Sequence, residues 1–377
     1  MKSIAIISPH FPPMNSGVGD YSWIMVQEWA KILDQVYVLT AQPQEFTPDE
    51  NNIKIFPSNS LKDFHHHLYL NISKLPIETK VLFQFTPNMY SRVGVNFQLL
   101  FTAIKLRLSG RQFSFYFHEK HYPLNFKWPD LILSLIHIFI YQNLKMLSSK
   151  ILYSFNEDHD PNFPYPVIPV CSNMPIVSGN DKEVLNRNNL DQYFIYFGST
   201  HPSKCVDWVI EAYCQLSESI QTKFPLVIVG SKIENLPCQQ LITNQNIKIL
   251  GYLSPIDVSN LLFHSSLVLA PFIDGVSSRR GSVLAALSNS ALVVTNIGRN
   301  TNPEIPWNDF CLLSNSDSKS DFFKFVEKSV VQLRTHDGKR ALAKIAYHQF
   351  FSSQKSAQRI KNILFLPDSL SSQNSVK

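Results

Sequence analysis

The sequence predicts an α/β protein made of two doubly wound parallel-sheet domains. Short apolar runs rich in β-branched and aromatic residues alternate with longer segments that have helical spacing. These runs are apolar throughout, as is typical of parallel strands that helices cover on both faces. The chain has 377 residues, of which 44% are apolar, so it is long enough for two domains with separate cores.

The expected strands fall into two groups. The first group lies at Ile4–Ile7, Val36–Leu39, Ile53–Phe56, Val81–Phe85, Phe113–Phe117, Ile151–Ser154 and Val167–Val170. The second group lies at Tyr193–Phe197, Leu226–Val229, Ile247–Leu250, Leu267–Ala270 and Leu292–Thr295. We therefore expect an N-terminal domain over residues 1–177 and a second domain over residues 193–339. The polar stretch 178–192 is the predicted linker, and the Ser-rich tail 367–377 is expected to be disordered.

Composition excludes several classes of protein. The net charge of +5 comes without the dense basic runs of a nucleic-acid-binding arm. Five scattered cysteines without a CxxC pair favour a reducing compartment, and hence the cytoplasm. The N-terminus lacks the long apolar stretch of a signal peptide. The most apolar segment, residues 131–141, is shorter than the roughly 20 residues of a membrane-spanning helix, so we expect a buried helix there.

The sequence offers two weak candidates for metal ligands, and we predict no metal site. Glu157–Asp160 contains an Asp-x-Asp pattern, but a proline-rich apparent loop follows it. His65, His66 and His67 are consecutive, and consecutive helical residues point in different directions.

Ligands of doubly wound sheets bind where loops follow the C-terminal ends of strands. Gly17 and Gly19 lie between the first strand and the first helix, where glycine lets a ligand approach the backbone and helix N–H groups attract phosphate. Their spacing is not GxGxxG, which disfavours a dinucleotide cofactor. A tight turn without a ligand is the alternative interpretation.

Three basic residues follow strands of the second half. Lys204 comes after its first strand, and Arg279 and Arg280 come after the strand at Leu267–Ala270. Two loops of one sheet can direct cations to one place, and guanidinium groups bind diphosphate in a bidentate manner. Because cations are unfavourable at a helix N-terminus, their position there indicates a bound anion. The alternative is a solvated helix start with salt bridges.

Five stretches carry a family resemblance: FPPMNSGVGDY, FGSTHPSK, LVIVGSK, LGYLSP and DGVSSRRGSVLAALSNSALVVT. They resemble retaining glycosyltransferases of family 4, which have the GT-B fold, and the likeness covers nearly the whole chain. It implies two Rossmann-like domains that face each other across a cleft, with the nucleotide sugar in the C-terminal domain and the acceptor in the N-terminal domain. It also implies that a C-terminal helix over residues 340–366 crosses back to the first domain.

The resemblance assigns roles to individual residues. We expect Asp274 and His118 to act on the transferred sugar. We expect contacts with the donor diphosphate from Lys204, Arg279, Arg280, Gly17, Gly19 and Ser282. We expect contacts with the nucleotide from Gly198, Gly230, Ser231, Tyr252 and Leu253. The donor is expected to be UDP- or GDP-linked, with neither a metal nor another cofactor.

Two departures from the family pattern affect the donor site. The usual pair of glutamates eight residues apart is replaced by Ser277 and Ala285, and the usual arginine after the strand-ending glycine is Ser199. The resemblance then implies that Asp274 replaces the first carboxylate and that Arg279 and Arg280 restore the lost cationic charge. The second carboxylate has no evident substitute.

Three function classes follow. The leading one is transfer of a sugar to a hydroxyl acceptor with retention, in the synthesis of a surface polysaccharide or glycolipid. The second is a non-catalytic protein that binds a sugar nucleotide. The third is another two-domain enzyme, such as a nucleotide-sugar epimerase or an NAD-linked oxidoreductase.

The sequence also suggests a peripheral membrane contact, at the inner face of the plasma membrane. Residues 92–150 contain eight Lys and Arg against Glu119 and Asp130, a net charge of +6, which leaves −1 for the rest of the chain. Phe126 and Trp128 are interleaved with these basic residues. Such a surface would suit a lipid-linked acceptor. An ordinary basic surface is the alternative.

Overall fold

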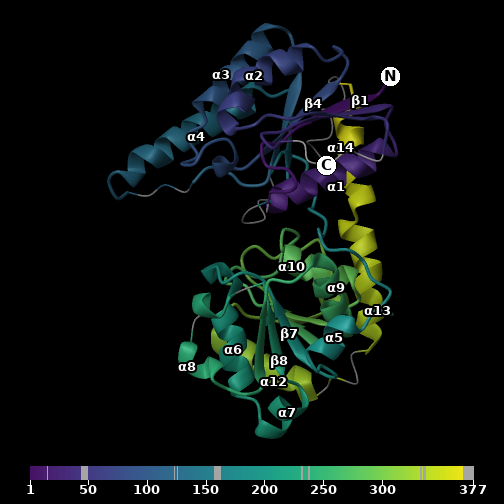
Figure 1. The fold of residues 1–377 in the computed structure, drawn as a ribbon. Coiled ribbons are helices and arrows are strands. Elements are labelled where there is room, and N and C mark those ends of the chain that lie inside the picture. The colour runs from purple at the N-terminus through teal and green to yellow at the C-terminus, as the bar shows by residue number, and fades with distance from the viewer. Residues whose placement is uncertain are drawn as a thin grey trace. The chain divides into compact units, whose positions relative to one another are not determined.

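The computed structural model describes residues 1–367 except residues 15, 44–49, 123, 125, 157–162, 231, 237, 332 and 334–336. The described residues form two compact units, each built on its own six-stranded parallel sheet (Figure 1). Unit 1 contains Met1–Phe155, the segment that ends at Pro169, and the C-terminal residues from Ser353 onward, whereas unit 2 contains Val170–Ser352. The predicted two-domain, Rossmann-like α/β fold is confirmed.

Unit 1 alternates strands with helices. Its elements are β1 (Ser3–Ile7), α1 (Gly17–Ala30), β2 (Gln35–Leu39), β3 (Ile53–Phe56), α2 (Leu61–Ser73), β4 (Lys80–Phe85), η1 (Pro87–Met89), α3 (Phe97–Leu108), β5 (Phe113–Phe117), α4 (Asp130–Leu147), β6 (Lys150–Tyr153) and α14 (Ser353–Phe365). The strand order is β3-β2-β1-β4-β5-β6. The chain adds strands outward from β1 to one edge of the sheet and then from β4 to the other edge, so the order of strands reverses between β1 and β4 while all strands stay parallel. Central strands are apolar at every position because helices cover both faces; in β1, for example, all five residues are buried.

Unit 2 repeats this arrangement. Its elements are α5 (Glu183–Arg187), β7 (Phe194–Phe197), η3 (Pro202–Lys204), α6 (Val206–Cys214), α7 (Glu218–Lys223), β8 (Leu226–Val229), η4 (Ile233–Asn235), α8 (Gln239–Ile242), β9 (Ile247–Gly251), α9 (Pro255–His264), β10 (Leu267–Leu269), α10 (Gly281–Ser288), β11 (Val293–Asn296), α11 (Trp307–Phe310), β12 (Cys311–Ser314), α12 (Lys319–Val331), α13 (Asp337–Ala346) and η6 (Tyr347–Phe351). The strand order is β12-β11-β10-β7-β8-β9, and the order of strands reverses between β7 and β10, which are parallel neighbours. We call this place the reversal point of the second sheet.

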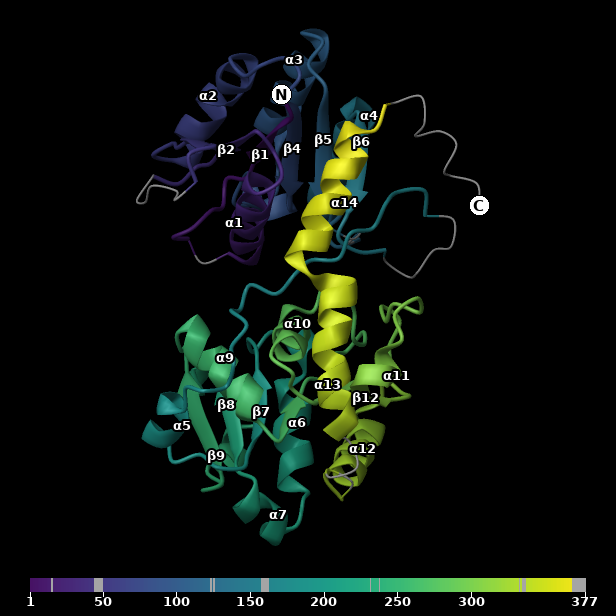
Figure 2. The same cartoon turned by 90° about the vertical axis from the view of Figure 1, so that its right-hand side faces the viewer.

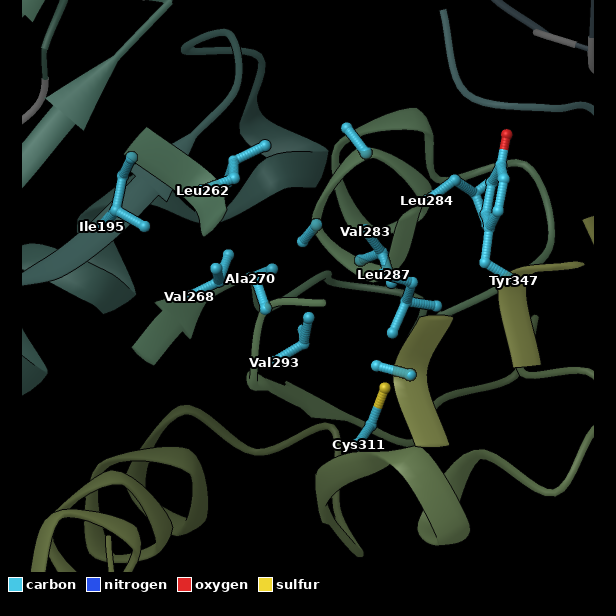
Figure 3. Close-up of a cluster of buried hydrophobic side chains, with 14 of the residues drawn as sticks. Ile195, Leu262, Val268, Ala270, Val283, Leu284, Leu287, Val293, Cys311 and Tyr347 are labelled. Atoms are coloured by element: carbon cyan, nitrogen blue, oxygen red, sulfur yellow. The ribbon is translucent and has the colours of Figure 1, made fainter. Parts of the chain in front are cut away.

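Helix α10 lies inside the core of unit 2. Figure 3 shows its side chains Val283, Leu284 and Leu287 among residues of β10, β11 and β12, with Tyr347 beside them. Every residue from Ser282 to Ser288 is buried. Because this helix is packed on all sides, its first turn is held in a fixed position.

Two expected strands differ from the structure. Val167–Val170 is not a strand: Val167 makes one isolated bridge with Tyr153, and Pro166 and Pro169 on either side lack the N–H groups that a ladder needs. Conversely, β12 was not predicted, because its four residues follow directly on the short helix α11. With β12, the second sheet has the same strand order as the first.

Two segments near the expected domain boundaries also differ from prediction. Residues 178–192 are not an extended linker, because α5 forms there and its Val184 and Leu185 join the core of unit 2 together with Leu190. Residues 340–366 form two helices rather than one. The break falls at Ser352, so that α13 belongs to unit 2 and α14 to unit 1. The tail 368–377 lies outside the described residues.

The apolar segment 131–141 lies in α4, as a helix, but it is buried on one side only. Ile140, Tyr141 and Leu144 join the core of unit 1, whereas Leu135 and Phe139 are exposed. The expectation of a buried helix was therefore wrong for half of its surface. In the described residues, α4 is also the one helix whose length and composition would allow it to cross a membrane.

Helix α14 is attached to unit 1 by specific contacts with α1. The indole Nε1 of the buried Trp29 donates to the carbonyl of Ala357 at 3.0 Å, and Glu28 accepts from Ser353 and Gln354. Figures 1 and 2 both show α14 beside α1. The last helix of the described residues is thus an integral layer of the N-terminal unit.

We predict that Ile360→Ala destabilises unit 1 by about 2–5 kcal/mol, because Ile360 is a fully buried residue of α14 and its truncation leaves a cavity. Urea unfolding followed by circular dichroism measures this loss. Gln358→Ala, on the exposed side of the same helix, is the matched control and should change stability by less than about 0.5 kcal/mol. Equal stabilities for the two variants would contradict the packing of α14 on unit 1.

Candidate functional site

The strongest candidate site lies at the reversal point of the second sheet. The loop after β7 carries Lys204, and the loop after β10 carries Asp274, Arg279 and Arg280. The two loops are neighbours, because the N–H of Ile273 donates to the carbonyl of Ser203 at 3.3 Å. Ligands of doubly wound sheets bind at this kind of reversal point.

Asp274 is the centre of a cluster of charges. Its Oδ1 is ion-paired with Arg280, and its Oδ2 accepts from Arg279 at 3.3 Å and from Asn300 Nδ2 at 2.6 Å. Asp274 and Arg280 are only 7% and 8% exposed. The guanidinium of Arg280 also lies over the ring of Phe272, 4.4 Å from its centroid. The predicted cations and the predicted carboxylate therefore meet, as partners of one another.

Lys204 adds a third positive charge to this cluster. Burial lowers the pKa of Lys204, and the charge of Arg280 lowers it further. Burial also lowers the pKa of Arg280, to about 10. Because this value is still well above 7, the guanidinium stays charged at neutral pH. Among the described residues, Lys204 has no ion-pair partner. Two arginines thus pair with one carboxylate, and the charge of Arg280 acts on the nearby Lys204. This excess of positive charge in a site with little solvent favours binding of an anion.

The loop after β10 and the neighbouring loop after β11 hold buried polar atoms that lack a hydrogen-bond partner within the described part of the chain. They are Ser277 Oγ, Ser278 Oγ, Arg280 Nε and Asn300 Oδ1. Buried polar groups in proteins are almost always hydrogen-bonded, and exceptions cluster at functional sites. Three of these four atoms can donate, so they suit a ligand rich in acceptor oxygens.

Asparagines at the end of β11 and after it fix the shape of the loop after β10. Asn296 accepts from the N–H of Phe272 at 2.8 Å, and Asn302 accepts from the N–H of Ser278 at 2.9 Å. Sequence reasoning missed these residues and Asn300. The sequence feature that could have indicated these asparagines is the asparagine-rich run TNIGRNTNPE, which begins at the end of a buried strand.

Two glycines allow the loop to pack backbone against backbone. Gly275 has a φ of +82°, and a Cβ there would come within 2.2 Å of the Gly298 nitrogen. A Cβ on Gly298 would come within 2.4 Å of the Asp274 carbonyl carbon. Asp274 is therefore held in place by the main chain as well as by its ion pairs.

Helix α10 begins directly after Arg280, which occupies its N-cap position without a side-chain cap. The free N–H groups of its first turn, which includes the buried Ser282, lie beside the charge cluster. These N–H groups favour negative charge, and they explain why two arginines at this position need Asp274 or another anion nearby.

The residues predicted to bind the nucleotide follow the neighbouring strands β7, β8 and β9. Gly198 and Gly230 are in close contact, because a Cβ on Gly230 would lie 3.0 Å from the Gly198 carbonyl oxygen. Tyr252 is exposed just after β9, and Leu253 packs partly on the core of unit 2. Ser231 lies outside the described residues.

The residues of unit 1 that were predicted to contact the donor come from the helix α1, which follows β1, and from the position just after β5. Gly17 begins α1, and the N–H of Gly19 donates to the capping hydroxyl of Ser16 at 3.3 Å. A Cβ on Gly19 would lie 3.2 Å from the backbone of His10, so close packing explains this glycine. A Cβ on Gly17, in contrast, would have no atom within 4 Å.

His118 follows β5 and lies in an aromatic setting. Its Nε2 is 2.6 Å from Gln84 Oε1, and its ring contacts those of Tyr21 and Tyr116. Burial lowers the pKa of His118 to about 3, so the ring is neutral at physiological pH. A neutral imidazole can donate or accept a hydrogen bond, but it is not a source of protons for catalysis near pH 7.

The histidines and acids considered as metal ligands have other partners or lie outside the described residues. His65 Nε2 is 2.9 Å from the Tyr90 carbonyl oxygen, and His67 pairs with Asp63. Within the described residues, no three His, Cys, Asp or Glu side chains are grouped so as to hold a metal. The Asp-x-Asp of residues 157–160 falls in an undescribed stretch.

Comparison with known proteins gives a family match and several structures of similar fold. Residues 177–279, which include Lys204 and Asp274, match the family described as Glycosyl transferases group 1. Sucrose-phosphate synthase from Thermosynechococcus elongatus has a similar structure, with a TM-score of 0.70 and 11% identity over 96% of this chain and 98% of that one. The chain has the GT-B fold.

Two further structures share the GT-B fold. HepE of Anabaena, solved in complex with UDP, has a TM-score of 0.68 and 14% identity over 97% of this chain and 99% of that one. WaaG, a glycosyltransferase involved in lipopolysaccharide biosynthesis, has a TM-score of 0.59 and 13% identity over 97% of this chain and 100% of its own. A search of curated proteins found no significant sequence match.

The burial of His118 predicts a pH dependence of stability. As pH falls below about 6.5, the unfolded chain takes up a proton on this residue, whereas the folded chain does so only near pH 3. Stability is therefore lost as pH falls. His118→Gln removes this contribution, so between about pH 7 and pH 5 the unmodified protein should lose about 2 kcal/mol more stability than the variant. Urea unfolding at both pH values measures this difference, and equal losses would contradict a buried neutral His118.

Proposed function

We propose that the protein is a retaining glycosyltransferase that moves a sugar from a nucleotide-diphosphate donor to a hydroxyl acceptor. The charge cluster at the reversal point of the second sheet carries this proposal. Three cations, the first turn of α10 and four polar atoms that have no partner among the described residues all lie around one place that suits two phosphates. The match to the family Glycosyl transferases group 1 includes most of the cluster, and the GT-B fold supports the same function.

Stabilisation of negative charge is the main chemical task of these residues. When the bond between sugar and diphosphate breaks, charge develops on the leaving phosphate. Lys204, Arg279 and Arg280 are positioned to stabilise that charge by charge-assisted hydrogen bonds in a site with little water. With retention, the acceptor attacks from the face that the diphosphate leaves, so the phosphate itself can take the acceptor proton and no protein base is required.

Asp274 has two successive roles in the proposal. In the unliganded site it is the counter-ion of Arg280 and Arg279. A bound diphosphate would compete for the same guanidinium groups and release carboxylate lone pairs. The carboxylate can then accept from hydroxyls of the donor sugar and orient it for transfer. Asn300 Nδ2 stays as the donor that holds the carboxylate in place.

The remaining assignments follow from the resemblance and from the surface of unit 1. We propose a UDP- or GDP-linked donor, no metal or other cofactor, and an acceptor that is a glycan or a lipid-linked glycan. His118 would donate a hydrogen bond to the sugar or the departing diphosphate as a neutral ring. The reaction would serve synthesis of a surface polysaccharide or glycolipid on the cytoplasmic side of the plasma membrane. HepE binds UDP and UDP-glucose in its solved complexes.

A specific observation favours a second candidate function. Ser277 and Ala285 stand where the resembled family has glutamates, and the remaining carboxylate, Asp274, is engaged by two arginines. A protein that binds the sugar nucleotide without transferring the sugar would need only the cations. Hydrolysis or transfer of a nucleotide sugar by the purified protein separates the two functions.

Loss of a cation should weaken binding of a nucleoside diphosphate. One charge-assisted contact contributes roughly 1.5–3 kcal/mol, so Lys204→Ala and Arg280→Ala should each weaken UDP or GDP binding by at least about tenfold in calorimetry. Lys328→Ala, on the exposed surface of α12, is the control and should bind normally. Unchanged affinity in a folded Lys204→Ala variant would exclude Lys204 from the diphosphate site.

Asp274→Asn should separate sugar transfer from diphosphate binding. The variant should keep or increase its affinity for UDP or GDP, because Arg280 loses its competing carboxylate, while transfer falls by about a hundredfold or more. The uncompensated buried arginine should also destabilise the free protein, by about 3–5 kcal/mol. Saturating nucleoside diphosphate should restore more thermal stability to the variant than it adds to the unmodified protein. Normal transfer per folded molecule would show that Asp274 has only a structural role.

A further inference from the structure

The outer side of α4 carries a row of exposed apolar side chains, interrupted by Gln142, that no described part of the protein covers. It consists of Ile132, Leu135, Phe139 and Met146 on the helix and Phe126 and Trp128 in the loop before it. We refer to these six residues as the α4 outer face. We propose that the α4 outer face, with the basic residues around it, binds the surface of a bilayer that contains anionic lipid.

The spacing of the helical residues places them in one row. Positions 132, 135, 139 and 146 are separated by three, four and seven residues, which brings them to the same side of an α-helix. Their exposure rises from 42% at Ile132 to 81% at Met146, and Trp128 is 75% exposed. Transfer of such side chains out of water is favourable by up to about 1.5–3 kcal/mol each when burial is complete.

Both sides of α4 carry apolar residues, and its inner side also carries polar ones. The inner side, which contacts the rest of unit 1, includes the buried polar residues Ser134 and His137. His137 Nε2 is 2.9 Å from the Val93 carbonyl oxygen. A surface helix normally directs its polar residues to solvent, so an apolar outer side indicates that something apolar covers it in use.

The position of α4 in the fold indicates that the helix lies on the bilayer and does not span it. It connects β5 to β6 in the parallel sheet (Figure 2), and its Ile140, Tyr141 and Leu144 belong to the core of unit 1. Crossing a bilayer would remove these side chains from that core. A helix in the plane of the interface buries only its apolar side, with aromatic rings at the level of the head groups.

Electrostatics favour anionic lipid as the occupant. Residues 92–150 carry a net charge of +6, whereas the rest of the chain carries −1. Arg92 is exposed in the loop that contacts His137, Lys127 is exposed between Phe126 and Trp128, and Arg107 is exposed on the adjacent helix α3. Each Lys or Arg close to an anionic surface contributes about 1 kcal/mol.

A second copy of the chain fits this surface less well. A symmetric dimer through the α4 outer face would bring two equally basic surfaces together, and like charges across an interface are unfavourable. Anionic head groups instead neutralise the basic residues while the acyl region accepts the apolar side chains. The inference is independent of the proposed transfer reaction, because it uses none of the residues of the unit 2 site.

Sedimentation with vesicles tests the proposal. The full-length protein should bind vesicles of phosphatidylglycerol and phosphatidylcholine, should bind phosphatidylcholine alone much more weakly, and should lose affinity as salt is raised. Phe139→Glu should weaken binding to the mixed vesicles by at least about tenfold. Ile345→Glu is the matched control, because Ile345 on α13 is 58% exposed and Phe139 is 55% exposed, and it should bind like the unmodified protein.

A second variant separates charge from apolar contact. Arg92→Gln with Lys127→Gln should weaken binding to the anionic vesicles on the order of tenfold while it leaves the weak binding to phosphatidylcholine unchanged. Circular dichroism and UDP affinity should be unaltered in all variants, so that a failure to bind lipid is distinct from a failure to bind the donor.

Three outcomes would overturn the proposal. One is that the unmodified protein does not sediment with anionic vesicles at low salt. Another is that Phe139→Glu and Ile345→Glu behave alike. The third is that Phe139→Glu converts a dimer to a monomer in light scattering without any change in vesicle binding, which would assign the α4 outer face to a second copy of the chain.

Discussion

The buried ion pair between Asp274 and Arg280 is the interaction on which the candidate site depends. Both side chains are more than nine-tenths buried, so removal of either one would leave an uncompensated charge in a poorly hydrated place. The pair is positioned by the packing of Gly275 against Gly298 and by the asparagines at the end of β11 and after it. It also fixes the start of α10. The geometry of the whole loop between β10 and α10 therefore follows from the need to keep these charges together.

Much of the fold could be predicted because the strands of covered parallel sheets are apolar at every position. That pattern located eleven of the twelve strands that the described residues form. It missed β12, whose four residues directly follow a short helix, and it added a strand at Val167–Val170, where prolines on both sides prevent a ladder. The segment 178–192 was mistaken for a linker because only three of its side chains, Val184, Leu185 and Leu190, supply the core contacts. Short elements leave too few residues for a pattern to show.

The site was only partly visible in the sequence, for a different reason. The order of strands and loops predicts that Lys204, Arg279, Arg280 and Asp274 lie at one edge of a sheet. It does not predict that Asp274 is bound by both arginines and by Asn300, since such contacts depend on loop conformation. Asn296 and Asn302 act through backbone groups of a distant loop, and no spacing rule indicates such partners. Ser277 and Ser278 gain interest only because the structure buries their hydroxyls and no described residue is their hydrogen-bond partner.

The two units share one strand order but differ in the chemistry at the equivalent edge of the sheet. In unit 2 the loops bring together three cations and a carboxylate. In unit 1 the edge near β4 and β5 is formed by Tyr21, Tyr116 and the neutral His118, with Gln84 as hydrogen-bond partner. A cationic edge suits a diphosphate, whereas a neutral edge of aromatic rings and hydrogen-bonding groups suits sugars and their hydroxyls. Because the same topology is used twice, this difference comes from the loops and not from the sheets. In the proposed transfer, this division of charge lets unit 2 stabilise the leaving diphosphate, while unit 1 offers uncharged hydrogen-bonding groups.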